Sequence, residues 1–189
     1  MTGEPRTGML LVATPKVSDP NFERAVVLIL DHDEDGTLGV VVNRPTEMSV
    51  TSVLEPWTDF VSAPDVLFQG GPVAKNSALA LAELPAGTSD EESPLGWRKL
   101  YGRLGLIDLD APPELVAGGL GSMRVFAGYS GWSPGMLERE IADGGWYVVD
   151  AEPEDPFTEK PEDMWRQVLR RQFGDLALVA TFPEDPTLN

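Results

Sequence analysis

Residues 25–42 read AVVLILDHDEDGTLGVVV, and this stretch decides the fold class. Two runs rich in β-branched and aliphatic residues, Ala25 to Leu30 and Gly39 to Val42, flank an acidic segment that ends in Gly36. Such runs around a polar, glycine-containing turn are typical of a β-hairpin. Asn43-Arg44-Pro45 is predicted to end the second strand, because proline cannot donate to a sheet ladder and favours an extended residue before it.

The rest of the chain adds strands and a few helices. The clearest helical pattern runs from Pro161 to Phe173, with one apolar face that includes Phe173 and with Gly174 as its stop. Another helix is predicted with Ser133 as N-cap and Pro134 as first residue. Further strands are predicted at residues 9–13, 66–68, 77–83, 104–109, 123–127 and 146–149, and short helices at 49–55 and 112–118. Because the strands cluster in hairpins, we expect an α+β fold with a mixed, mainly antiparallel sheet flanked by helices.

The length of 189 residues predicts one domain over the whole chain, 1–189. Residues 85–96 are rich in proline, glycine, acids and hydroxyls, which is typical of a mobile surface loop. Residues 151–158 form an acidic, proline-containing connection. Neither segment has the character of a linker between domains.

The formal net charge is −17, from 14 basic and 31 acidic residues. The negative electrostatic potential of such a chain repels the phosphates of nucleic acids and anionic membrane surfaces, so we expect neither a nucleic acid nor a membrane as a partner. The densest basic cluster, Arg166, Arg170 and Arg171, directly follows several acidic residues and is interpreted as a solvated helix face.

Cysteine is absent, which excludes disulfides, thiolate nucleophiles and cysteine-based zinc sites. No run approaches the ~20 apolar residues of a membrane span, and the first six residues lack the features of a signal peptide. We therefore expect a cytoplasmic protein.

The segment Gly128-Tyr129-Ser130-Gly131-Trp132 lies between a predicted strand and a predicted helix, where a hydrolase places its nucleophilic serine. The second glycine comes one residue too early for that motif. His32, the sole histidine, would have to act as the general base without an evident orienting acid. We interpret the segment as a tight structural turn.

Two other patterns resemble ligand sites only in part. Asp31-x-Asp33-x-Asp35-Gly36 matches the first half of a calcium loop, but Val42 stands where the closing glutamate is needed. The glycine-rich stretches 118–121 and 128–135 lack the spacing of dinucleotide or P-loop sites. We expect no metal and no cofactor. The helix predicted to begin within residues 128–135 presents free N–H groups at its N-terminus, and these can bind a small anionic ligand.

Several motifs together resemble the YqgE/AlgH family. The N-terminal ones are Gly8-x-Leu10-Leu11-x-Ala13-x-Pro15 with Asp19 and Phe22, Arg24-x-Val26-Val27-Leu28-Ile29 with His32, and Gly39-x-Val41-x-Asn43-Arg44-Pro45. The later ones are Gly70-Gly71-Pro72-Val73, the segment from Gly128 to Glu140, and Trp146. The resemblance implies a compact α+β fold with a bifurcated sheet, and the family name suggests transcriptional regulation.

The leading functional hypothesis is a non-enzymatic binding or regulatory domain that contacts a protein or a small anionic ligand. The rival is a small-molecule enzyme using Ser130, His32 or Arg44. A transcriptional regulator is disfavoured, because no helix-turn-helix and no basic face is predicted.

A binding site, if present, is predicted where loops follow strands, because polar groups there do not disturb the core. Arg44 offers a fork of donors for a carboxylate or phosphate. In the competing interpretation, the polar groups bond loop carbonyls and the aromatic rings pack in the core. The predicted site residues are Asn43, Arg44, Gly70, Gly71, Tyr129, Ser130, Gly131 and Trp132.

Overall fold

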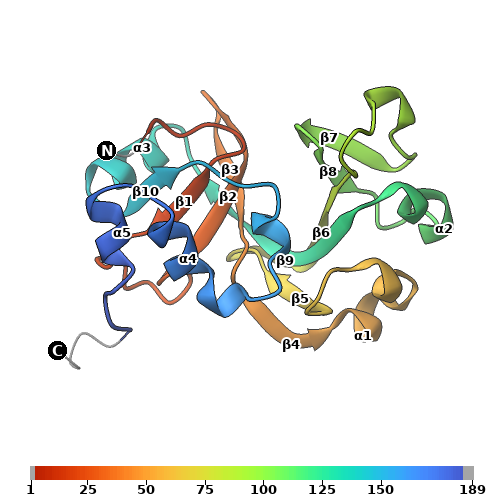
Figure 1. The fold of residues 1–189 in the computed structure, drawn as a ribbon, viewed down its shortest axis with the longest axis horizontal. Helices are drawn as coiled ribbons and strands as arrows, with labels where there is room; N and C mark the ends of the chain where they lie inside the picture. The colour runs from red at the N-terminus through yellow and green to blue at the C-terminus, as the bar shows by residue number, and fades with distance from the viewer. Residues whose placement is uncertain (1–2, 185–189) are drawn as a thin grey trace.

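The computed structural model describes residues 3–184 and shows a curled, branched β-sheet with helices on its outer faces (Figure 1). The strands are β1 Leu10–Ala13, β2 Val26–Asp33, β3 Gly36–Val41, β4 Pro45–Ser49, β5 Val66–Gln69, β6 Val73–Glu83, β7 Trp97–Tyr101, β8 Leu104–Ile107, β9 Ser122–Trp132 and β10 Trp146–Val149. The α-helices are α1 Val50–Leu54, α2 Pro113–Val116, α3 Met136–Ala142, α4 Met164–Arg170 and α5 Asp175–Val179. Within residues 3–184 no helix is long and apolar enough to cross a lipid bilayer.

The sheet confirms the expected α+β class. Its main path runs in the order β10-β1-β2-β3-β9-β6-β8-β7, while β4 and β5 branch off beside β9. Among the described strand pairs, β5 and β9 run parallel and all other pairs are antiparallel. The long strand β9 therefore joins two lobes: the first holds β1, β2, β3 and β10, and the second holds β4 to β8.

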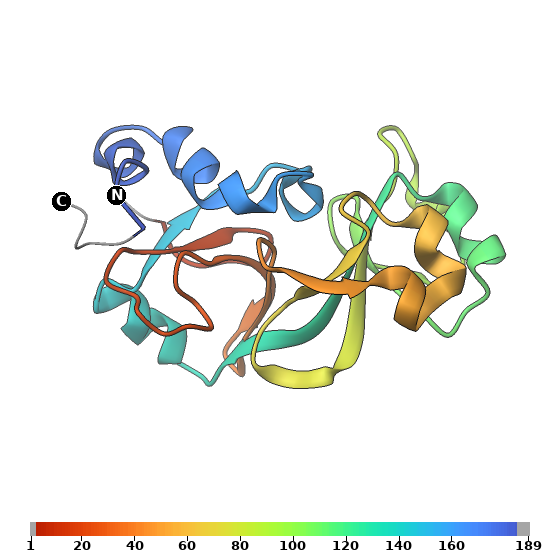
Figure 2. The same ribbon diagram turned by 90° about the horizontal axis from the view of Figure 1, so that it is seen from below.

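In the first lobe the strands are buried on both faces. Leu10 and Val12 of β1 pack toward α4, whereas Leu11 and Ala13 pack toward α3. Figure 2 shows the same layering, with α4 and α5 on one side of these strands and α3 on the other. Continuous apolar runs such as residues 26–30 follow from this double burial.

The second lobe has its own core beneath α1 and α2. Trp57, Trp97 and Met123 are buried there together with aliphatic residues of β5, β6 and β8. The indole N–H of Trp97 donates to the carbonyl of Ala82 at 3.0 Å, so its polar atom is satisfied inside the core.

Glycines mark the point where the sheet branches. Gly70 donates from its N–H to the carbonyl of Ala127 at 2.9 Å and accepts from the N–H of Val41 at 2.9 Å. A Cβ on Gly128, whose φ is 74°, would lie 2.6 Å from the carbonyl oxygen of Gly71. Three stretches of backbone thus meet too closely for side chains.

Several local predictions are wrong. The segment 128–132 is the end of β9 rather than a turn. Helix α3 has Gly135 as N-cap and no capping side chain, so Ser133 and Pro134 precede it. Phe173 is 98% exposed, because α4 ends at Arg170 before the predicted apolar face reaches that residue.

Candidate functional site: an arginine-lined cavity

The eight predicted site residues fall into two separate groups. Gly70, Gly71 and Ser130 are buried at the sheet branch, where the Ser130 hydroxyl donates to the Gly70 carbonyl at 3.0 Å. Trp132 is also buried, and its indole N–H donates to Glu140 Oε2 at 2.8 Å. Tyr129 is half-buried and Gly131 is exposed.

Asn43 and Arg44 follow β3, and the Arg44 carbonyl accepts from the N–H of Gln69, beside Gly70, at 2.8 Å. They line a cavity of about 170 Å³ together with residues from the start of β2, from α4 and from the C-terminal segment. This volume is close to the ~150 Å³ of a cavity that holds one benzene molecule. The other lining residues are Glu23, Arg24, Pro161, Glu162, Trp165, Arg166 and Glu184.

Asn43 fixes the backbone next to Arg24. Its side-chain oxygen accepts from the N–H of Val26 at 2.9 Å, and its amide nitrogen donates to the carbonyl of Arg24 at 2.9 Å. Arg24 has φ 54°, in the left-handed region that a long side chain rarely adopts. Such a conformation costs of order 1 kcal/mol and persists only where the surroundings enforce it.

The guanidinium of Arg24 lies 4.2 Å from the centre of the Trp165 ring. Trp165 is buried in α4, and its indole N–H donates to the carbonyl of Ala13 at 2.8 Å. The ring therefore holds a fixed position against β1 and supplies an electron-rich face for the cation. This contact fixes one wall of the cavity.

Arg44 forms the opposite part of the basic lining. One terminal nitrogen donates to the carbonyl of Glu23, while Nε is buried without a hydrogen-bond partner in the described chain. Burial lowers the pKa of Arg44, and the charge of Glu23 partly opposes that effect. A buried donor without an acceptor is costly, which makes this side chain a candidate for ligand contact.

Backbone carbonyls of the C-terminal segment approach the cavity from outside. Arg24 donates to Phe182 at 2.8 Å and to Pro183 at 2.6 Å, and Arg166 donates to Ala180. In each of these two arginines the other terminal nitrogen has no hydrogen bond to the described residues and is reachable by solvent. The cavity therefore retains donors that the protein does not use.

The three guanidinium groups of Arg24, Arg44 and Arg166 form no ion pair within residues 3–184. The pKa of Arg24 is lowered, first by burial and then by the neighbouring charge of Arg166. Three glutamates also line the cavity, but none of their oxygens lies within 4.0 Å of these cations. The lining thus carries three positive and three negative formal charges, in a chain of net charge −17.

Of the residues that line this cavity, Asn43 and Arg44 were predicted from the sequence as site residues, and the others were not. The basic cluster is a solvated face only in part: Arg170 is exposed, whereas Arg166 is half-buried at the cavity and Arg171 donates to both oxygens of Asp155, at 2.8 and 2.5 Å. Arg24 carries a usable signal, because a cation directly precedes the apolar run of residues 25–30. Trp165 and Arg166 are adjacent on α4, and only the tertiary fold brings them to β2.

The residues of the enzyme hypothesis are not joined in a catalytic arrangement. His32 Nδ1 lies 2.6 Å from the hydroxyl of Thr37, and its Nε2 lies 3.4 Å from Glu138 Oε1. Ser130 is fully buried and bonded to Gly70. No hydrogen bond links Ser130 with His32 among the described residues.

Sequence relatives extend over nearly the whole chain. A UPF0301 protein of Streptomyces coelicolor is 61% identical over 183 residues, covering 97% of this chain and 95% of the relative. A UPF0301 protein of Mycobacterium tuberculosis is 45% identical over 184 residues, covering 97% and 91%.

Solved structures agree with the sequence relatives. A crystal structure of a Corynebacterium diphtheriae protein has a TM-score of 0.89 and 35% identity over 96% of this chain and 95% of that one. The solution structure of the AlgH protein from Pseudomonas aeruginosa has a TM-score of 0.66 and 27% identity, covering 97% and 98%. The AlgH-like family profile (DUF179) matches residues 10–177, and the chain belongs to this family, as its motifs indicate.

Proposed function

We propose that this protein is a non-enzymatic binding domain of the cytoplasm, and that the arginine-lined cavity holds a small anion such as a carboxylate or a phosphate ester. One observation carries the proposal: three guanidinium groups from distant parts of the sequence surround one cavity, and none forms an ion pair within the described residues.

The chemistry favours an anion with several oxygens. A guanidinium presents a planar fork of donors that matches carboxylate and phosphate oxygens. Arg24, Arg44 and Arg166 each keep one terminal nitrogen without a hydrogen bond to the described residues, whereas the Nε of Arg44 is buried and not reachable by solvent. An anion would also relieve the repulsion between Arg24 and Arg166 that lowers the pKa of Arg24.

The volume of the cavity and the negative charges at its lining limit which ligands can bind. About 170 Å³ accommodates a phosphate or a short carboxylic acid, but it does not hold a nucleotide. Glu23, Glu162 and Glu184 at the lining repel a highly charged anion. The ligand class is therefore a small anion of low charge.

Inorganic phosphate and acetate, titrated at constant ionic strength, test the proposal. We expect phosphate to raise the melting temperature saturably, because a ligand that binds only the folded state stabilises it by mass action. Arg44→Gln should weaken this effect at least fivefold, whereas Arg139→Gln on an exposed turn of α3 should leave it unchanged. Equal phosphate effects in all three proteins would refute the site, and so would no effect of either anion in the wild type.

A further inference from the structure

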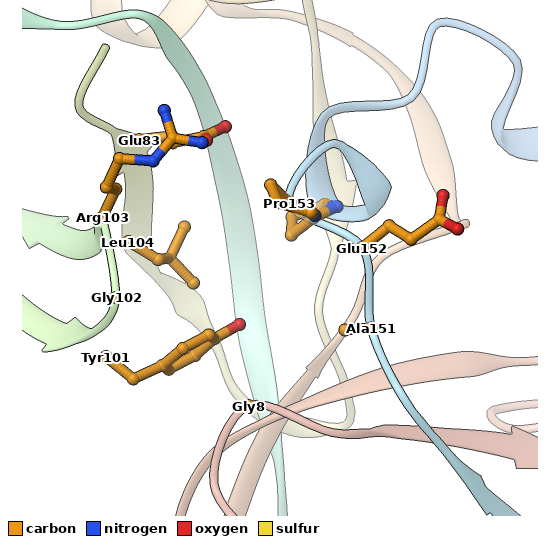
Figure 3. Close-up of a pocket in the computed structure, with 10 residues that line it drawn as sticks. Gly8, Glu83, Tyr101, Gly102, Arg103, Leu104, Ala151, Glu152 and Pro153 are labelled. Atoms are coloured by element: carbon orange, nitrogen blue, oxygen red, sulfur yellow. The ribbon is translucent and has the colours of Figure 1, made fainter. Parts of the chain in front are cut away.

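A second cavity, of about 230 Å³, lies between the two lobes and shares no residue with the arginine-lined cavity. Glu83 and the β7–β8 hairpin form one wall, while Gly8 and the loop 151–156 form the other. Figure 3 shows the Tyr101 hydroxyl pointing from the hairpin toward Pro153 on the opposite wall. Binding pockets occur preferentially where two such packing units meet.

The Tyr101 ring is held firmly in this cavity. A Cβ on Gly8, whose φ is 91°, would lie only 3.1 Å from the ring, so the ring packs directly on the Gly8 backbone. Among the described residues the Tyr101 hydroxyl has no hydrogen-bond partner, and it is reachable by solvent. The hydroxyl is thus a fixed, unused donor.

Two cations near the cavity, Arg103 and Arg171, are already paired with carboxylates. Arg103 lies 2.9 Å from Glu83 Oε1 and also donates to the Leu84 carbonyl at 3.2 Å. Arg171 holds Asp155 and Glu152, so the carboxylates behind the loop are fixed in place. The second oxygen of Glu83 has no partner among the described residues, so it remains a free acceptor.

The protonation states follow from the surroundings. Burial raises the pKa of Tyr101 to about 12, and the charges of Asp155 and Glu83 add to that effect. Burial also raises the pKa of Glu83, which Arg103 partly opposes. At neutral pH the phenol is therefore a neutral donor in a region of negative potential.

We propose that this inter-lobe cavity binds a small, uncharged, planar molecule that carries both a carbonyl-type acceptor and an N–H donor. The acceptor takes the hydrogen bond of Tyr101, and the N–H group donates to Glu83. The apolar body lies against Leu104 and the prolines of the loop. An anion is repelled by the carboxylates, and a cation without an acceptor leaves Tyr101 unsatisfied.

Three probes of equal shape separate these cases: benzamide is neutral, benzoate is an anion and benzamidine is a cation at neutral pH. The cavity exceeds the ~150 Å³ that suffices for benzene, so each probe fits. Titrations followed by ¹H–¹⁵N NMR should show saturable benzamide shifts at Gly8, Gly102 and Leu104. We expect benzoate, which the carboxylates repel, to bind at least tenfold more weakly than benzamide. Benzamidine offers no acceptor to Tyr101, so its affinity should not depend on the Tyr101 hydroxyl.

Two conservative variants test the assignment of each hydrogen bond. Tyr101→Phe keeps the ring on Gly8 and should weaken benzamide at least fivefold, while Tyr147→Phe on β10 should change nothing. Glu83→Gln should reduce the preference for benzamide over benzoate. The absence of saturable benzamide shifts, benzoate binding as tight as benzamide, or equal benzamide affinity in Tyr101→Phe would overturn the proposal.

Discussion

Replacing Arg124 by methionine should destabilise the protein by about 3 kcal/mol. Arg124 is only 1% exposed and lies near the start of β9. Its guanidinium donates to the carbonyls of Ala63 at 2.6 Å, Pro156 at 3.1 Å and Thr158 at 2.9 Å. These hydrogen bonds therefore connect the second lobe with the segment that precedes α4.

The magnitude follows from what methionine leaves behind. Its side chain keeps the apolar contact with Phe68, over which the guanidinium now lies at 4.2 Å, but it donates to no carbonyl. Each unsatisfied buried carbonyl costs about 1–3 kcal/mol. Burial lowers the pKa of Arg124 to about 10, so removing the charge recovers part of the loss. Ala63 is exposed and Thr158 half-buried, so water reaches both and the lower limit of about 1 kcal/mol each applies.

Urea denaturation monitored by tryptophan fluorescence measures this effect, since a stability change shifts the midpoint while the slope stays constant. Arg139→Met, on the exposed side of α3, serves as control and should stay within about 0.5 kcal/mol of wild type. A loss of unfolding free energy below 1 kcal/mol in Arg124→Met would refute the claim that this side chain stabilises the contact between the second lobe and the segment that precedes α4.

Three further outcomes are expected. Gly71→Ala should lower the free energy of unfolding in urea by about 3 kcal/mol, because its Cβ would overlap the Tyr129 carbonyl. The control Gly118→Ala has open space around the new Cβ and should lower it by under about 1 kcal/mol. Equal losses in the two variants would contradict this prediction. Absorbance titration should show one tyrosine ionising near pH 12 that Tyr101→Phe removes; since this folded-state pKa is raised, the stability it contributes should be lost as pH rises from 10 through 12. Gel shifts should show no saturable, sequence-dependent duplex DNA binding at physiological salt, given the net charge of −17, and nanomolar specific binding would contradict this.

The sheet was predictable because its signals are local. The hairpin of residues 25–42 appears as β2 and β3, although the strands run on to meet at Asp33 and Gly36. Strand 77–83 was also predicted correctly, within the longer β6. In contrast, β4 and β7 lack apolar alternation and pair at the sheet margin, so their sequences do not indicate strands.

The glycines and the cavities were harder to interpret. Gly70, Gly71 and Gly128 permit a close approach of backbone, and the backbone that approaches is the protein's own at the sheet branch. Arg44 and Asn43 were predicted as site residues from local chemistry. Arg24 flanks the same hairpin as Asn43 and Arg44, so the predicted pairing already placed it near them. Arg166 could not be grouped with them, because helix packing brings it to the cavity from 142 positions beyond Arg24.

The binding of a small anion by the three arginines is tested most directly by NMR of the arginine Nε–H groups during a phosphate titration at constant ionic strength. We expect saturable shifts with one dissociation constant at Arg24, Arg44 and Arg166, with no change at Arg139, which lies outside the cavity. Shifts of similar size at Arg139, or no saturable shift at the three cavity arginines, would contradict the binding of an anion in this cavity.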